Sequence, residues 1–201
     1  MKMLPLLCAL TVLSAQALRA QTLSPAEVNK AVQYLEKTRS GVIKATQGLS
    51  PAQWNFKPAT NRWSVAEVTE HIAAAEDLLR DMIQNQVMKS PVATNAANAK
   101  QVDAMVMKRV PDRSVKAQAP EPLQPRNRYG SPEASLKHFE ESRAKTIELV
   151  QSTPDLREHS ADSPLGTRLD GYEWVLFIAA HSERHTKQIE EVKATPGFPK
   201  Q

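Results

Sequence analysis

The segment LDGYEWVLFIAAHSERHTKQIEEVK, residues 169 to 193, decides the fold, because it holds the start signal and the inner face of one long helix. Its beginning, Asp170-Gly171-Tyr172-Glu173, is a capping box with aspartate as the N-cap. Behind this cap, one stripe recurs at steps of four and three residues: Trp174, Ile178, His181, His185, Gln188 and Val192. A helix over 170–193 is predicted, and other helices must cover its stripe.

The same kind of start signal recurs earlier in the chain. Capping boxes stand at Ser24-Pro25-Ala26-Glu27, Ser50-Pro51-Ala52-Gln53 and Ser64-Val65-Ala66-Glu67, and Ser131-Pro132-Glu133 is a cap without a full box. Together with the apolar periodicity, these signals predict long helices over 25–47, 64–89, 131–152 and 170–193. Shorter helices are predicted at 51–56 and 101–110.

Four long amphipathic helices with one long connection favour a four-helix bundle. The connection, residues 90–130, lies between the second and third long helices and ends in a proline-rich stretch. It is long enough to cross the end of the bundle, so helices 2 and 3 can run parallel. No segment alternates between apolar and polar residues as a strand does. The predicted fold class is therefore all-α, with a long crossover between helices 2 and 3.

The first twenty residues have the layout of a secretory signal peptide. Lys2 is followed by the apolar run Leu4 to Leu13, Ala15-Gln16-Ala17 fits a small-x-small cleavage site, and cleavage after Ala20 also fits the pattern. The alternative is a membrane anchor or a buried first helix. We expect residues 1–20 to be the signal peptide, residues 21–201 to form one domain, and the protein to be exported to a periplasm or secreted.

Cysteine and charge narrow the possible functions. Cys8 is the only cysteine and lies in the predicted signal, so a metal site in the domain must use nitrogen and oxygen ligands. The formal charge of +4 falls to +2 when Lys2 and Arg19 are removed, and the basic residues are spread among acids. This pattern does not favour binding to nucleic acid or, after signal removal, to membrane. The expected partner is an unidentified small-molecule substrate, and a homodimer is compatible with the sequence.

Three histidines are predicted to face the bundle interior from two helices. His181 and His185 lie on the stripe of the last helix, and His71 lies on a stripe of the second: Val68, His71, Ala75, Leu78 and Met82. An unsatisfied buried polar group costs about 1–3 kcal/mol, and a divalent ion bound to all three rings would remove that cost while keeping positions open for water or substrate. In the alternative, carboxylates satisfy the rings without metal: Glu67, Glu70, Glu173 or Glu183.

Residues close to these histidines are candidates for a supporting role. Gln188 lies one turn beyond His185 on the same stripe, whereas Glu70 and Arg184 lie beside the stripes. No catalytic residue can be assigned from the pattern. The remaining histidines, His138 and His159, lie off the inner stripes and are not expected to be ligands.

Two motifs resemble the DinB-like (DinB/YfiT) superfamily, in its secreted bacterial branch. They are WSVAEVTEH, residues 63 to 71, and LDGYEWVLFIAAHSERHTKQIEEVKATPGFP, residues 169 to 199. The resemblance implies a four-helix bundle with a long crossover, and a zinc or nickel ion held by three histidines, here His71, His181 and His185. Some members are thiol-dependent transferases of the cytosol, and others resemble isomerases or hydrolases. This chain departs from them in its export signal, and in having Arg184 where many members have a histidine.

The residues and the resemblance together predict an exported, divalent-metal-binding bundle that acts as a metal-dependent hydrolase or transferase on an unassigned substrate. The alternative is a non-catalytic bundle that holds a metal ion or a small ligand without turnover.

Overall fold

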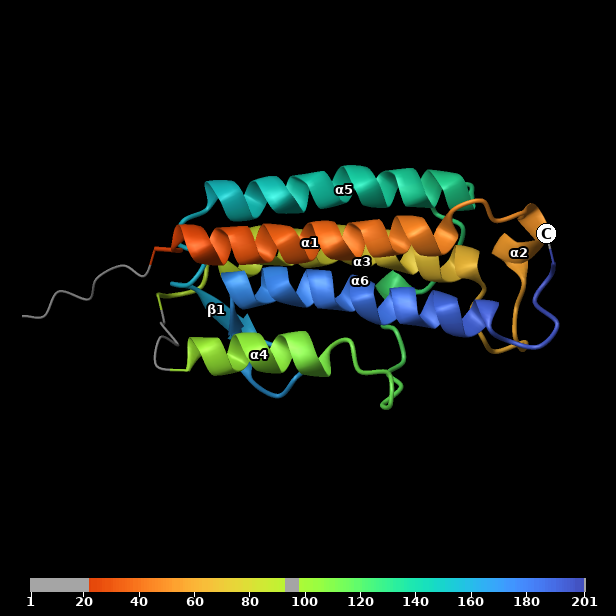
Figure 1. The fold of residues 1–201 in the computed structure, drawn as a ribbon. Helices are drawn as coiled ribbons and strands as arrows, with labels where there is room; N and C mark the ends of the chain where they lie inside the picture. Colours follow the sequence, from red (N-terminus) through yellow and green to blue (C-terminus); the bar gives the residue numbers. More distant parts are fainter. Residues whose placement is uncertain (1–21, 93–97, 201) are drawn as a thin grey trace, which may run out of the picture.

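Four long helices lie side by side in the computed structural model, which describes residues 22–92 and 98–200 (Figure 1). They are α1 (Pro25–Thr46), α3 (Val65–Met82), α5 (Pro132–Ser152) and α6 (Gly171–Lys193). Each begins within one residue of its predicted start, so the all-α class and the four-helix bundle are confirmed. The predicted signal peptide, residues 1–20, lies outside the described residues.

Shorter elements connect the long helices. They are α2 (Pro51–Asn55), the π-helix η1 (Ile83–Val87), α4 (Ala99–Arg109), the 3-10 helix η2 (Glu121–Leu123), and the strands β1 (Ser160–Asp162) and β2 (Arg168–Asp170). α2 and α4 correspond to the short helices predicted at 51–56 and 101–110. η1 continues α3 with a wider turn, so the helical path reaches Val87, close to the predicted end at residue 89.

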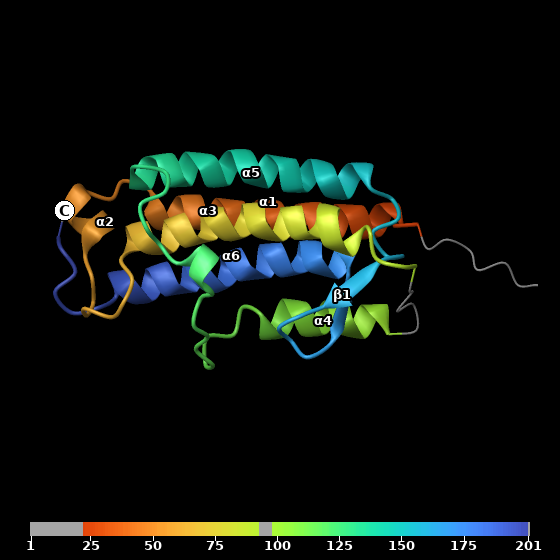
Figure 2. The same ribbon diagram turned by 180° about the vertical axis from the view of Figure 1, so that it is seen from behind.

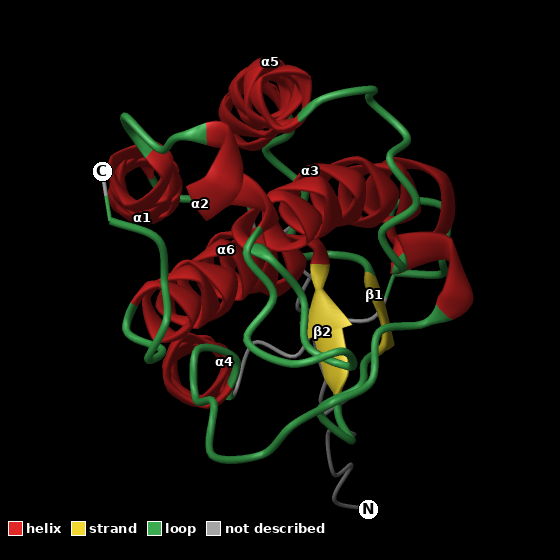
Figure 3. Ribbon diagram, turned by 90° about the vertical axis from the view of Figure 1, so that its right-hand side faces the viewer, coloured by secondary structure: helices red, strands yellow, loops and turns green. Residues whose placement is uncertain are grey.

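The crossover gives the bundle its topology. α3 and α5 run in the same direction, and α1 and α6 run in the opposite one (Figures 1 and 2). α1 and α3 each pack against both α5 and α6. Parallel neighbours need a connection that returns along the bundle, and the chain between α3 and α5 provides it, as predicted. Its helix α4 lies against α6, outside the four-helix core (Figure 3).

The predicted helix starts are present as local structures. Ser24, Ser50, Ser64 and Asp170 each accept a hydrogen bond from the backbone N–H three residues later, and the glutamate or glutamine there bonds the cap in return. Each box satisfies backbone donors that a helix start leaves without partners. The cap at Asp170 therefore sets the register in which α6 presents His181 and His185.

The absence of strands was a wrong prediction. β1 and β2 pair antiparallel, with Ala161 opposite Leu169, and a turn with Gly166 in the left-handed region (φ 77°) joins them. Each strand has only three residues, which is too short for an alternating pattern to be recognised. The hairpin leads directly into the cap of α6, so it helps to place that helix.

Apolar side chains form two main clusters along the bundle, one around Leu35 and Trp174 and the other around Val42 and Ile189. Between them, each long helix contributes a buried polar residue: Thr38, Glu76, Arg143 and Ser182. Leu78, predicted on the inner stripe of α3, is instead 43% exposed, because the crossover covers that face only in part. Within residues 22–92 and 98–200, no helix has the length and apolar character needed to cross a membrane.

Candidate metal centre

The three predicted histidines meet at one point in the bundle. His71 comes from α3, and His181 and His185 come from successive turns of α6. The Nε2 atom of His71 lies 3.3 Å from Nε2 of His181 and 3.1 Å from Nε2 of His185, and the last two are 3.1 Å apart. Among the described residues, this is the one group of histidines, cysteines or acids that converges closely enough to share an ion.

The carboxylates that might have satisfied these rings have other partners. Glu67 accepts from Ser64 and Lys57, Glu70 from residues 126–128, Glu173 from Asp170, and Glu183 from Tyr34 and Lys187. The metal-free alternative, in which acids satisfy the three imidazoles, is therefore not what the structure has.

The hydrogen bonds of His71 fix its tautomer. Its Nδ1 atom lies 2.9 Å from the carbonyl oxygen of Leu123 in η2. A carbonyl only accepts, so Nδ1 carries the hydrogen and Nε2 of the neutral ring presents a lone pair to the other two histidines. The Nδ1 atom of His185 lies 2.8 Å from the amide oxygen of Gln188. Both arrangements turn Nε2 lone pairs toward a common point, which a cation would stabilise.

The separations of the nitrogens fit a metal ion. Three nitrogens bound to one ion at about 2.0–2.1 Å lie about 2.9 Å apart when the bonds are perpendicular and about 3.4 Å apart in a tetrahedral arrangement. The observed 3.1 to 3.3 Å lies within this interval. The spacing of His71, His181 and His185 would thus allow all three to bind one divalent ion.

Burial keeps the rings in the neutral form that binds metal. Desolvation, and then the neighbouring imidazoles, lower the pKa of His181 and His185 well below its usual value. Desolvation also lowers the pKa of His71. Neutral imidazole is the ligand form, because protonation removes the lone pair. At pH 7 the three rings are therefore available without first losing a proton.

Aromatic side chains stand beside the cluster. The Trp63 ring lies 5.0 Å from the His71 ring, and the Phe177 ring lies 6.4 Å from the His181 ring and nearly parallel to it, both measured between centroids. These rings give the cluster apolar neighbours apart from the indole nitrogen, and His181 itself is half-buried.

Of the three supporting candidates, only Gln188 touches a histidine of the cluster. Glu70 instead accepts the backbone N–H groups of residues 126, 127 and 128 and the side chain of Arg128. Burial alone would raise the pKa of Glu70, but these hydrogen bonds lower it overall. Arg184 donates to the carbonyls of Val110, Asp112 and Val115. Both side chains therefore hold the crossover beside the cluster.

Two further residues at the centre were not predicted. Leu123 acts through its backbone carbonyl, for which a sequence contains no signal. Arg113 donates to Gln188 from the crossover, and only its position in the fold reveals that contact. His138 and His159, as expected, are not part of the cluster: His138 bonds Asp77, and His159 bonds the carbonyl of Ser90.

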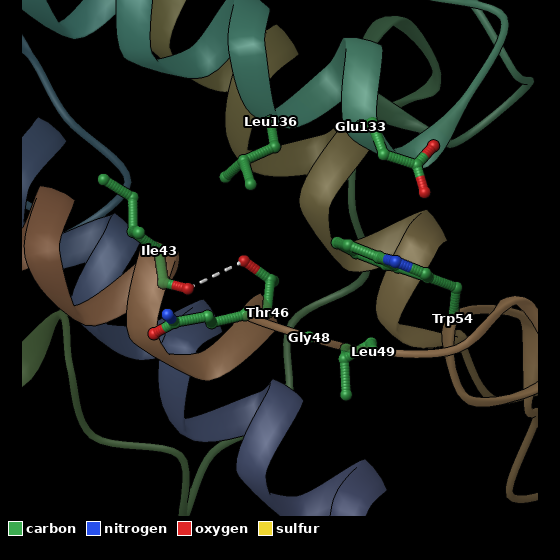
Figure 4. Close-up of a pocket in the computed structure, with 8 residues that line it drawn as sticks. Ile43, Thr46, Gly48, Leu49, Trp54, Glu133 and Leu136 are labelled. Atoms are coloured by element: carbon green, nitrogen blue, oxygen red, sulfur yellow. Dashed lines mark hydrogen bonds between the residues drawn. The ribbon is translucent and has the colours of Figure 1, made fainter. Parts of the chain in front are cut away.

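A hollow of about 370 Å³ lies elsewhere, between α1, α2 and the start of α5 (Figure 4). Ile43, Leu49, Trp54 and Leu136 give it a largely apolar lining, and none of the three clustered histidines borders it. Glu133 is its one titratable lining residue. This hollow therefore lies apart from the histidine cluster.

Comparison with known proteins finds a family match and a relative of similar sequence. Residues 34–189, which include all three histidines, match the DinB superfamily. The uncharacterized protein YuaE of Bacillus subtilis strain 168 is 25% identical over 148 residues, which are 73% of this chain and 87% of YuaE.

A solved structure adds a likeness in fold. YfiT from Bacillus subtilis, described as a probable metal-dependent hydrolase with an unusual four-helix bundle topology, superposes with a TM-score of 0.54 at 14% identity, over 89% of this chain and 93% of YfiT. At that identity the likeness concerns the fold. The match of residues 34–189, by contrast, spans most of the sequence, and the chain belongs to the DinB superfamily.

Proposed function

We propose that this protein is a divalent-metal-dependent hydrolase whose ion, zinc or nickel, is held by His71, His181 and His185. The observation that carries the proposal is the convergence of their three Nε2 atoms within 3.1 to 3.3 Å of one another. The description of YfiT as a probable metal-dependent hydrolase with the same kind of bundle supports it.

The ligand set suits hydrolysis. His71, His181 and His185 would hold the ion, which would supply Lewis-acid chemistry: it would lower the pKa of water toward about 7 and polarise a substrate oxygen. His71 and His185 are oriented by Leu123 and Gln188, which accept from Nδ1 and so keep Nε2 free. The aromatic rings of Trp63 and Phe177 lie beside the imidazoles of His71 and His181. We favour a hydrolase over a transferase because hydrolysis needs only water as the second reactant.

Export is part of the proposal and is supported by the signal pattern in residues 1–20. In an exported protein the reaction would not depend on cytosolic thiols. Fractionation of cells that express the full chain tests this part: the shortened protein should leave the cytoplasm. Retention of the full-length chain in the cytoplasm would contradict it.

The catalytic part is tested on protein purified without a histidine tag. We expect about one equivalent of zinc or nickel after reconstitution, and hydrolysis of at least one member of a panel of esters, amides and phosphoesters. A chelator should abolish that activity, and added metal should restore it. His138→Ala is the matched control, since this histidine lies outside the cluster.

Two results distinguish the metal-dependent hydrolase from the alternatives. Metal binding that is lost in His71→Ala and His185→Ala, without hydrolysis of any substrate in the panel, would favour the non-catalytic binding bundle. Absence of bound metal after reconstitution would contradict the proposal altogether.

A further inference from the structure

A chain of polar contacts leads from the crossover to a histidine of the cluster. Arg113 lies in the crossover just after α4, and its side chain is only 14% exposed. Its Nε and Nη2 atoms donate to the two carboxylate oxygens of Glu191, at 2.6 and 2.8 Å. Its third donor, Nη1, lies 3.1 Å from the amide oxygen of Gln188. The bidentate pair with Glu191 fixes the guanidinium plane and so aims Nη1 at Gln188.

The chemistry of these groups leaves one consistent arrangement of hydrogens. Guanidinium has donors and no acceptor, so Gln188 must turn its amide oxygen, not its NH₂ group, toward Arg113. The same oxygen lies 2.8 Å from Nδ1 of His185. An oxygen only accepts, so Nδ1 of His185 must carry the hydrogen. The neutral ring then has its lone pair on Nε2, which faces His71 and His181.

We propose that Arg113 is a positioning residue that sets the ligand-ready tautomer of His185 through the amide of Gln188. This role rests on the proposed metal site, and it makes a residue of the crossover responsible for the orientation of one metal ligand. Leu123, also in the crossover, fixes His71 in the same way through its carbonyl. Two of the three rings are therefore set for metal binding by the one connection that crosses the bundle.

Arg113 is needed because the oxygen and the NH₂ group of the Gln188 amide have nearly the same shape, so either can face His185. Without a donor beside it, Gln188 can rotate and present its NH₂ group to Nδ1 of His185. That arrangement places the hydrogen on Nε2, where it blocks the metal. Mutation of a group that hydrogen-bonds a metal-binding histidine, as Gln188 does here, typically weakens metal affinity or activity 10- to 100-fold. We expect Arg113→Met to weaken zinc binding at least about 10-fold, and to do so through the tautomer.

The tautomer itself is the first readout, because it can be measured without an ion. In metal-free protein labelled with ¹⁵N, the two ring nitrogens of His185 have different shifts according to which one carries the hydrogen. Wild type should have the hydrogen on Nδ1, and Arg113→Met should have a substantial population with it on Nε2. Arg62→Met is the matched control, because Arg62 also approaches Glu191, at 3.9 Å, without donating to Gln188; it should resemble wild type.

A rescue variant separates this role from a merely structural one. A carboxylate accepts with either oxygen and cannot turn a donor toward His185. Gln188→Glu in the Arg113→Met background should therefore return the hydrogen to Nδ1 and recover zinc affinity, measured by competition with a chelator. A general loosening of the crossover would not be repaired by this change.

The outcomes are distinct from those of the proposed function. If Arg113→Met keeps the hydrogen fully on Nδ1, or if Gln188→Glu fails to restore it, the role of Arg113 is overturned. If the tautomers behave as expected but wild type binds no zinc or nickel, the metal site is wrong while the Arg113 relay stands.

Discussion

At the scale of single residues, Arg143 holds together the buried polar residues that lie between the two apolar clusters of the core. The residue is fully buried, and its guanidinium binds both carboxylate oxygens of Glu76 at 2.7 and 2.8 Å. It also donates to the Leu35 carbonyl and to the hydroxyls of Thr38 and Ser182. This one side chain therefore joins α1, α3, α5 and α6 beside the histidine cluster.

Arg143→Met should be strongly destabilising, because it leaves the Glu76 carboxylate buried with no cation. Breaking a buried pair in this way costs about 3–5 kcal/mol. Replacing both partners, as in Arg143→Met with Glu76→Leu, should recover most of that loss. Urea unfolding measures the free energies. A loss below about 1 kcal/mol in the single variant would mean that the pair is not as desolvated as the structure has it.

Burial of Glu173 makes the stability of the fold depend on pH. Desolvation and the neighbouring Asp170 raise its pKa to about 8. Asp170, whose pKa burial raises to about 6, and Asp103 share one guanidinium, that of Arg157. The folded state thus binds a proton on Glu173 more tightly than the unfolded state does. The stability that this proton contributes is complete below pH 4.5 and is lost as the pH rises toward about 8.

Glu173→Gln should therefore gain stability relative to wild type as the pH rises from 5 to 8. A glutamine keeps the capping box and cannot lose a proton. The difference in unfolding free energy between the two proteins, measured with urea at several pH values, should grow by up to about 1.4 kcal/mol per pH unit. A constant difference across this range would contradict the raised pKa.

At the residue level, periodicity predicted the three histidines on inner faces, but it also placed Leu78 there, and that side chain is 43% exposed. The helical repeat places His71, His181 and His185 on inner faces, so their meeting could be anticipated. The contacts of Arg113 and Leu123 could not, because they depend on how the crossover lies against α3 and α6.

At the scale of elements, two glycines in long helices differ in whether the structure has space for a Cβ atom. A Cβ atom on Gly41, inside α1, would lie 3.7 Å from Thr186, which is ordinary contact. A Cβ atom on Gly171, the first residue of α6, would lie 2.8 Å from the backbone carbonyl oxygen and a side-chain carbon of Leu156. Gly171 is thus required where α6 crosses the chain after α5.

Gly41→Ala and Gly171→Ala should shift stability in opposite directions. Alanine at position 41 should stabilise the protein by about 0.5–1 kcal/mol, because alanine favours the helix interior. At position 171 it should destabilise the protein, because a backbone atom cannot move aside as a side chain can. Thermal unfolding of the two variants is the measurement. Equal effects of the same sign would show that the packing around Leu156 adjusts freely.

Element boundaries were predictable because caps are local. Each capping box is contained within four consecutive residues and needs no distant partner, so the starts of α1, α2, α3 and α6 can be read directly. The hairpin β1–β2 was missed for the converse reason: its strands are stabilised by each other and by the start of α6.

At the scale of the whole molecule, the crossover is fastened to the bundle beside the histidine cluster at several points. Glu70 binds backbone amides of residues 126–128, Arg184 binds carbonyls between 110 and 115, and Leu123 binds His71. The bundle and its parallel neighbours could be predicted from four helices and one long connection. The path of that connection could not, because its contacts involve mostly backbone groups.

Metal binding should stabilise the whole fold, since the unfolded chain lacks the assembled site. With zinc at 100 times its dissociation constant, the gain is about 2.7 kcal/mol, or about 5–10 °C in Tm for a chain of this size. His181→Ala should show little of this shift, and a chelator should reverse it in wild type. Equal shifts in the wild type and in His181→Ala would place the stabilising ion elsewhere.

Anomalous diffraction at the metal edge, from crystals grown with zinc or nickel, tests the central claim most directly, because it locates the ion without assuming its ligands. We predict one peak in the bundle, bonded to Nε2 of His71, His181 and His185 at about 2.0–2.1 Å. A peak at another site, or the three rings turned apart with no ion between them, would contradict the account.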